Sequence, residues 1–439
     1  LDAEKQKKRK DHAPILSRNG HTCGLPPGPW PLPVIGSLHL LGNLPHRSLA
    51  RLAETQGPVL SLRLGAVTTV VVSSSDVARE IMQKQDAILA TRSVPDALNF
   101  VPWLPHSDPR WRALRKIVTS ELLAPDRLDA LQHLRREKVL DLVDHVRCLP
   151  QEGVAIDVNR ISRDGTDLDD HGRSKEFKEM IGEIMEVAGR PNLSNLLAVA
   201  GGWEGCLHGC TGRSTTRSTR GFAGGEAVKS DFLYHLLDAA LGEDGTAGWT
   251  ARLSCRCSRN TSSNTVERAM VELLPNPFSM VRTCDELAKI IGSGRNIEES
   301  EISRLPYHQS VIKEAFRLHP PAPLLLPRQA QVTTNVLGHT IPEGTRLLVN
   351  VWEMGRDKDI WPNPENFFRK GSWKGQLILE VETLSSYHLA QDVVSSVQDG
   401  APSSLLNQFK WSLPLEIGRN GVDVAEKYGV TLVKEGHHG

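Results

Sequence analysis

The chain has 439 residues, with 52 basic and 52 acidic side chains, a formal net charge of zero and 39% hydrophobic residues. This length allows a large core, whereas the balanced charge gives no general basis for nucleic-acid binding. Seven scattered cysteines, and no apolar run of about 18–20 residues, exclude a disulfide framework and a transmembrane helix and favour a reducing compartment.

The N-terminal residues 1–24 are predicted to form a basic, disordered tail, because Lys and Arg cluster within residues 5–10. From residue 25 to residue 439 we expect one domain. It begins with LPPGPWPLPVIG over residues 25–36, in which the prolines favour a stiff, extended spacer.

The first half of the domain carries clear secondary-structure patterns. Residues 46–57 have helical spacing of apolar positions, and residues 58–73 alternate around a turn at Gly65–Ala66, which predicts a hairpin. Ser74, Ser75 and Asp76 predict an N-cap before a helix over residues 77–85. Further helices are predicted over residues 108–124 and 126–147.

Three patches break this patterning, at residues 201–226, 249–260 and 368–403. The first two are rich in Gly, Arg, Ser, Thr and Cys, whereas the amphipathic segments SDFLYHLLDAAL and TVERAMVELL lie between and after them. An abrupt switch of this kind suggests out-of-frame or mis-spliced reading, which the nucleotide sequence would test.

The block from Leu305 to Asp359 contains EAFRLHPPAPLLLPRQA and later VWEMGRDKD, and C-terminal to the third patch the chain reads NQFKWSLPLEIGRNGVDVAEKYGVTLVK. These segments resemble plant microsomal cytochromes P450, which are haem-thiolate monooxygenases, and within them the terpenoid-hydroxylating, geraniol-hydroxylase-like group. The resemblance implies the mostly α cytochrome P450 fold with a small β-rich lobe. It also implies haem b and insertion of one oxygen atom of O₂ into a small lipophilic substrate.

For partners, the resemblance implies a flavoprotein reductase that supplies electrons from NADPH. Microsomal members lie at the endoplasmic reticulum membrane, held by an N-terminal anchor. Because this sequence shows no transmembrane anchor, it predicts a cytoplasmic or peripheral location.

Glu314 and Arg317 lie at i, i+3 on a helix predicted over residues 306–319. By resemblance they belong to a buried Glu-Arg-Arg network on the proximal side of the haem site. Arg369 is the nearest, displaced candidate for the third member. The alternative is a solvated ion pair on a helix face.

By resemblance, Trp111 and Arg115, at i, i+4, would face a haem propionate, and Arg328 in LLLPRQA matches another propionate-facing position. For each arginine alone, an exposed surface cation is the better interpretation, and it is the surrounding sequence that favours the family reading.

The family activates oxygen with a small residue, Gly, an acid and Thr on one helix. Aligning on TVERAMVELL places Cys257 and Ser258 at the first two positions, Asn260 at the acid and Thr261 at the Thr. Asn260 has no proton to relay. Thr261 is equally compatible with an ordinary helix N-cap.

The ligand itself is missing, because no cysteine occurs after Cys284. The family places its ligand in a Phe-x-x-Gly-x-Arg-x-Cys-x-Gly turn, and it is the standard example of a haem thiolate that favours O–O cleavage. His388 is the nearest other candidate ligand, and a lone His is more often a surface or core residue. We therefore predict a degenerate member that does not bind haem as the family does and folds with low stability.

Three other readings stay open. The sequence could misread an active monooxygenase, or the chain could be a non-catalytic protein that binds small molecules. A structural zinc site could form from Cys206, His208, Cys210, Cys255 and Cys257, although no patterned structure surrounds them.

Overall fold

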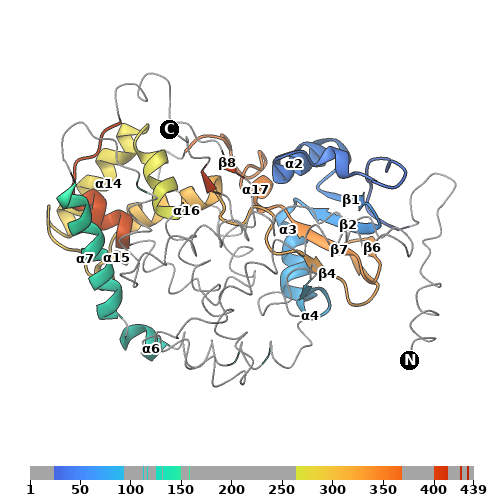
Figure 1. The fold of residues 1–439 in the computed structure, drawn as a ribbon, viewed down its shortest axis with the longest axis horizontal. Coiled ribbons are helices and arrows are strands. Elements are labelled where there is room, and N and C mark those ends of the chain that lie inside the picture. Colours follow the sequence, from blue (N-terminus) through green and yellow to red (C-terminus); the bar gives the residue numbers. More distant parts are fainter. Residues whose placement is uncertain are drawn as a thin grey trace, which may run out of the picture.

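The computed structural model describes residues 24–92, 112, 116, 125–130, 132–149, 158, 264–367, 400–413, 426–427 and 433–434. Within these ranges the fold is mostly helical, with a smaller lobe built around a sheet at one end (Figure 1). None of the described helices is long and apolar enough to span a bilayer.

Helices lie near the positions predicted at residues 46–57, 126–147 and 306–319, and several others are not predicted. The described helices are η1 (Leu38–Leu40), α2 (Pro45–Gln56), α3 (Ser75–Arg79), η2 (Glu80–Lys84), α4 (Asp86–Leu89), α6 (Pro125–Ala130), α7 (Gln132–Cys148), α14 (Pro277–Ile290), α15 (Glu299–Ile302), α16 (Pro306–Leu318) and α17 (Val351–Met354). Residues 264–273 and 400–408 are also helical.

The strands are short, and most of them lie in the sheet lobe. They are β1 (Val59–Leu64), β2 (Val67–Val72), β3 (Thr91–Arg92), β4 (Arg328–Gln329), β5 (Thr334–Val336), β6 (His339–Ile341), β7 (Arg346–Val349), β8 (Glu426–Lys427) and β9 (Val433–Lys434). The main sheet has the order β1-β2-β7-β4-β3, and β5-β6 and β8-β9 form separate pairs.

The predicted hairpin is confirmed as β1 and β2, which pair antiparallel and turn at Gly65–Ala66. β2 also pairs in parallel with β7, a segment from the second half of the chain (Figure 1). Val70 and Val72 enter one apolar cluster, while Val71 enters another on the opposite face. A strand buried on both faces explains the unbroken valine run.

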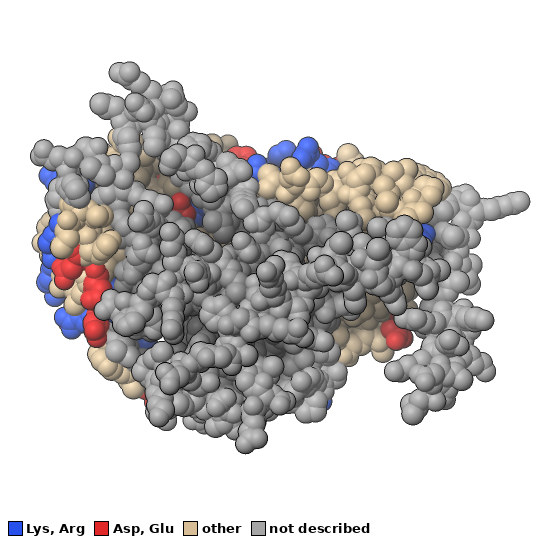
Figure 2. All heavy atoms as spheres, in the orientation of Figure 1, with Lys and Arg blue, Asp and Glu red and all other residues tan. Residues whose placement is uncertain are grey.

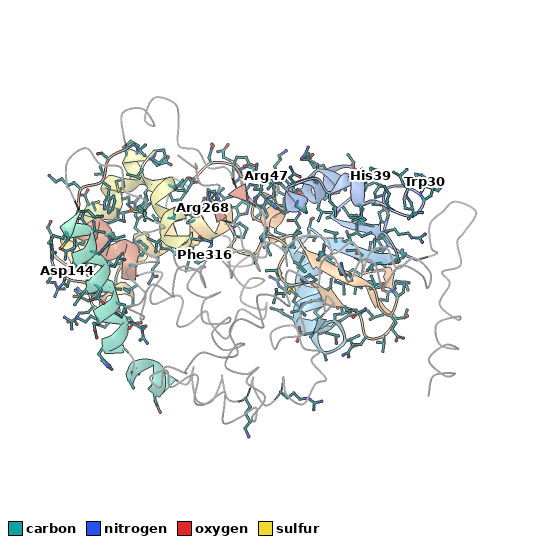
Figure 3. The ribbon with its side chains drawn as sticks, viewed as in Figure 1. Trp30, His39, Arg47, Asp144, Arg268 and Phe316 are labelled. Carbon is teal, nitrogen blue, oxygen red and sulfur yellow. The ribbon has the colours of Figure 1, made fainter. Side chains whose placement is uncertain are left out.

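The proline-rich segment is packed on the sheet lobe and is not a free spacer. The Ser61 N–H donates to the carbonyl of Pro27 at 2.8 Å, and the Ser61 hydroxyl donates to Pro26 at 2.7 Å. A Cβ added to Gly28 would lie 1.9 Å from the Ser61 carbonyl oxygen, so only glycine permits this approach. Trp30 stands exposed at the outer end of the lobe (Figure 3).

The helix predicted over residues 77–85 is wrong in detail. Ser74 has the extended backbone of an N-cap, but its hydroxyl makes no capping hydrogen bond. The α-helix ends at Arg79 and continues as the π-helical turn η2. Apolar spacing predicts a helix but not a change in its hydrogen-bond period.

The helical part has its own apolar core. α14, α16 with its N-cap residue, and the segments 264–273 and 400–408 contribute Met270, Leu273, Leu287, Leu305, Val311, Leu318 and Leu406. Leu142 and Val146 of α7 pack with Val266 and Leu405 in an adjoining cluster.

Charged side chains of both signs gather at the end of the molecule where α7 and α15 lie (Figure 2). Arg135 of α7 donates to both carboxylate oxygens of Glu299 of α15, with Nη2 to Oε2 at 2.8 Å. This forked pair fixes the two helices to each other.

Glu286 of α14 supplies a cap for α16 from outside that helix. Its carboxylate accepts the backbone N–H groups of Tyr307 at 2.9 Å and His308 at 2.8 Å. We expect Glu286→Ala to lower the free energy of unfolding by about 1–2 kcal/mol, because first-turn donors lose an anionic acceptor. Urea denaturation would measure the loss. Lys289→Ala, at an exposed position of the same helix, is the control and should change little.

Asn350 joins three elements of the sheet lobe and is fully buried. Its backbone N–H donates to Val72 at 2.8 Å, and its side-chain amide donates to the carbonyl of His46 at 3.0 Å. Its side-chain oxygen accepts the N–H of Glu353 at the start of α17.

Glu353 should make stability depend on pH. Burial, and then the neighbouring Glu54 carboxylate, raise the pKa of Glu353 above its ordinary value. The folded chain therefore holds this proton to higher pH than the unfolded chain. Its contribution to stability is present below the ordinary carboxyl pKa and is lost as pH rises through the raised pKa. We expect Glu353→Gln to remove this fall in the free energy of unfolding, measured by denaturation at a series of pH values. The same dependence on pH in the variant and in the parent chain would contradict the prediction.

Candidate functional site

The strongest candidate side chains lie on α16. Pro306 occupies the first turn, where its missing N–H costs nothing, and the helix ends at Leu318, shortly before Pro320 and Pro321. Glu314 and Arg317 point from one face of this helix and are each 2% exposed. The pair is therefore buried, and the solvated alternative does not hold.

Arg317 uses every donor of its guanidinium. Its Nε and Nη2 donate to the two oxygens of Glu314 at 2.9 and 2.7 Å. Nη1 donates to the carbonyls of Gly355 and Pro364, each at 2.6 Å, and Nη2 donates also to Asn366 at 3.1 Å. A buried arginine with all five N–H groups accepted is compatible with a low-dielectric core.

These contacts fasten residues 355–366 to α16. The Arg317 guanidinium carbon lies 4.8 Å from the ring centre of Trp361, which adds a cation–π contact. A Cβ on Gly355 would lie 2.4 Å from the Arg317 carbonyl oxygen, so the chain can pass this close only at a glycine. The sequence analysis did not identify Gly355 or Trp361. For Gly355, the available signal was a glycine directly after the residues of α17.

The third member predicted for this network, Arg369, lies outside the described residues. Three backbone carbonyls accept from the Arg317 N–H groups that do not donate to Glu314. The contacts of Arg317 therefore have a structural role, because they hold the segment that leads to Phe367.

Arg328 lies on β4, between β7 and β3. It is 4% exposed, and its Nη1 donates to Asp86 Oδ1 of α4 at 2.6 Å. Arg328 is thus a buried, paired cation and not an exposed surface arginine. Asp86 was missed from the sequence, since no local pattern links residues so far apart in the chain.

The other predicted site residues are Trp111, Arg115, Thr261 and His388, and they lie outside the described residues, as do Cys257, Ser258 and Asn260. Arg112 and Lys116, which neighbour the first two, are helical as predicted. The cysteines and histidine of the zinc reading are also outside the described residues.

The donors present do not fit a haem-thiolate site. No cysteine occurs after Cys284, and the two cysteines in the described part of the chain lie on α7 (Cys148) and α14 (Cys284). Burial, and then the nearby Asp285 charge, raise the pKa of the Cys284 thiol, which disfavours the thiolate form that binds metals. Within the described ranges, no three His, Cys, Asp or Glu side chains group as metal ligands.

Comparison with known proteins gives a direct family match. The sequence model of the family described as "Cytochrome P450" matches residues 26–164 and 258–369, which is more than half of the chain. The patch at 201–226 falls in the interval between these matches, and most of the patch at 368–403 lies beyond the second.

Curated relatives cover nearly the whole chain. The geraniol 8-hydroxylase of Catharanthus roseus is 38% identical over 474 positions, covering 95% of this chain and 93% of the relative. The geraniol 8-hydroxylase of Swertia mussotii is 36% identical, covering 93% and 92%. The geranylhydroquinone 3''-hydroxylase of Arnebia euchroma is 34% identical, covering 93% and 91%. Since the first alignment is longer than the chain, that relative has residues with no counterpart here.

Proposed function

Because this chain belongs to the cytochrome P450 family, we propose that it is a terpenoid-hydroxylase-type member that has lost its thiolate ligand and does not catalyse the family's oxygen insertion. The family is that of haem-dependent monooxygenases. The names of the relatives, geraniol and geranylhydroquinone hydroxylases, support a small lipophilic terpenoid as the ancestral substrate class. In this proposal the chain keeps the family's fold and loses the ligand that oxygen insertion requires.

One observation carries this proposal: residues 285–439 contain no cysteine. The family's ligand loop belongs between the segment fastened by Arg317 and the helix at 400–408, so its absence does not depend on where the chain ends. The thiolate ligand is what this family uses to favour O–O cleavage. The amide Asn260 at the acid position weakens proton relay as well.

Family membership also supports a redox partner, for which we propose a flavoprotein reductase that uses NADPH. It supports the endoplasmic reticulum membrane as the site of the ancestral activity.

The proposal is tested by expressing the chain with added haem precursor, then measuring haem content and the ferrous–CO spectrum. We expect little bound haem and no thiolate-type, red-shifted Soret band. A red-shifted band in the purified wild-type chain would sink the proposal.

A second reading is favoured by the patches themselves, since the family match stops at residue 164, resumes at residue 258 and stops again at residue 369. In this reading the native protein is an active monooxygenase whose sequence is misread in these intervals. Sequencing genomic DNA and transcript around codons 370–404 separates the two: a reading frame with a Cys-containing loop supports misreading, and a confirmed frame without it removes that reading.

A further inference from the structure

Among the described residues, Arg328 has far fewer acceptors than Arg317, another buried arginine. Arg317 gives its five N–H groups to five acceptors. Arg328 is almost as buried, yet within the described part of the chain it donates to Asp86 alone. A buried guanidinium carries a large desolvation cost and needs a counter-anion at all times.

The segments that carry the two partners are held by contacts outside the ion pair. Arg328 is fixed in β4, which pairs with Leu347 of β7. Next to Asp86, the side chain of Gln85 accepts the Thr334 hydroxyl at 3.0 Å and donates to the Asn335 carbonyl at 3.1 Å. These contacts hold the residue that precedes α4 against β5, and they do not involve Arg328.

Asp86 and Arg328 differ in how well water can solvate their side chains if the ion pair opens. Asp86 is 46% exposed in its side chain, whereas that of Arg328 is 5% exposed. If the pair opens, water can solvate the carboxylate but scarcely reaches the guanidinium. Loss of the Asp86 carboxylate therefore leaves the guanidinium buried without a counter-anion, unless another anion takes the place of that carboxylate.

We propose that Asp86 is the built-in counter-anion of Arg328 and occupies the guanidinium that the family reading assigns to a carboxylate of the cofactor. The chain's own carboxylate then competes with any carboxylate ligand at this position. This inference rests on the family reading of Arg328, but not on the loss of the cysteine.

The first test removes the carboxylate and offers a small replacement. We expect Asp86→Ala to lower the thermal unfolding midpoint by several degrees in chloride, and acetate at equal ionic strength to restore part of the loss. Acetate should give no such recovery in the wild type or in Asp76→Ala, which removes an exposed carboxylate 4.0 Å from Arg79. An unchanged midpoint for Asp86→Ala, or no recovery specific to acetate, overturns the proposal.

The second test identifies the competing ligand, using haemin and its dimethyl ester, which lacks the free propionates. Asp86→Asn should bind haemin about tenfold more tightly than the wild type, as expected for one regained charge-assisted hydrogen bond. The ester should show no gain, and Asp86→Glu should behave as the wild type. Equal haemin affinity of wild type and Asp86→Asn, or an equal gain for the ester, overturns the inference. A red-shifted ferrous–CO band tests the loss of the thiolate separately.

Discussion

Arg317→Ala is expected to lower the free energy of unfolding by about 3–5 kcal/mol, the range for breaking a buried ion pair from one side. Both oxygens of the buried Glu314 carboxylate lose the guanidinium that donates to them. The carbonyls of Gly355, Pro364 and Asn366 lose donors in the same step. Urea denaturation followed by circular dichroism would measure the loss.

The chain offers a matched control with the same i, i+3 spacing. Asp144 and Arg147 of α7 form an ion pair with side chains 67% and 54% exposed, and Asp144 lies at the outer surface of the helical part (Figure 3). Arg147→Ala should cost no more than about 0.5 kcal/mol, because water screens an exposed pair. Arg317→Lys should fall between the two, since a lysine keeps the charge but cannot reach five acceptors. Equal losses for Arg317→Ala and Arg147→Ala would contradict the structural role of the network.

The sequence patterns predicted those helices and strands whose formation depends on residues close together in the chain. The hairpin of β1 and β2 and the helix α16 follow from alternation, apolar spacing and flanking prolines, all of which are readable within about 15 residues. The placing of Glu314 and Arg317 on one face of α16 follows from the same periodicity.

Contacts between distant segments were beyond such reasoning. The parallel pairing of β2 with β7, and the pair formed by Asp86 and Arg328, join residues with no local relation in sequence. The proline-rich segment was predicted as a spacer because proline stiffness is a local property, while its packing on Ser61 depends on the tertiary position of β1. Gly355 is required by a backbone approach that becomes visible only when α16 is in place.

The residues on both sides of the segment 368–399 are held by packed structure, so the proposed loss of function can be tested by replacing this segment. On one side, Phe367 packs in the helical core, directly after the residues that Arg317 fastens. On the other, Ser403 Oγ lies 2.7 Å from His308 Nε2 of α16, and both side chains are buried. A replacement segment would therefore start and end at fixed points.

We expect a chimaera that carries a relative's segment, with the Phe-x-x-Gly-x-Arg-x-Cys-x-Gly loop, in place of residues 368–399 to incorporate haem. It should show the red-shifted ferrous–CO band that we expect the present chain to lack, because the loop returns the thiolate to a scaffold whose α16 network needs no change. The same chimaera with the loop cysteine replaced by alanine is the control and should lack the band. If the cysteine-bearing chimaera folds but shows no such band, the loss of activity does not reside in this loop alone, and the intervals around residues 201–226 and 249–260 must also have removed parts of the haem site.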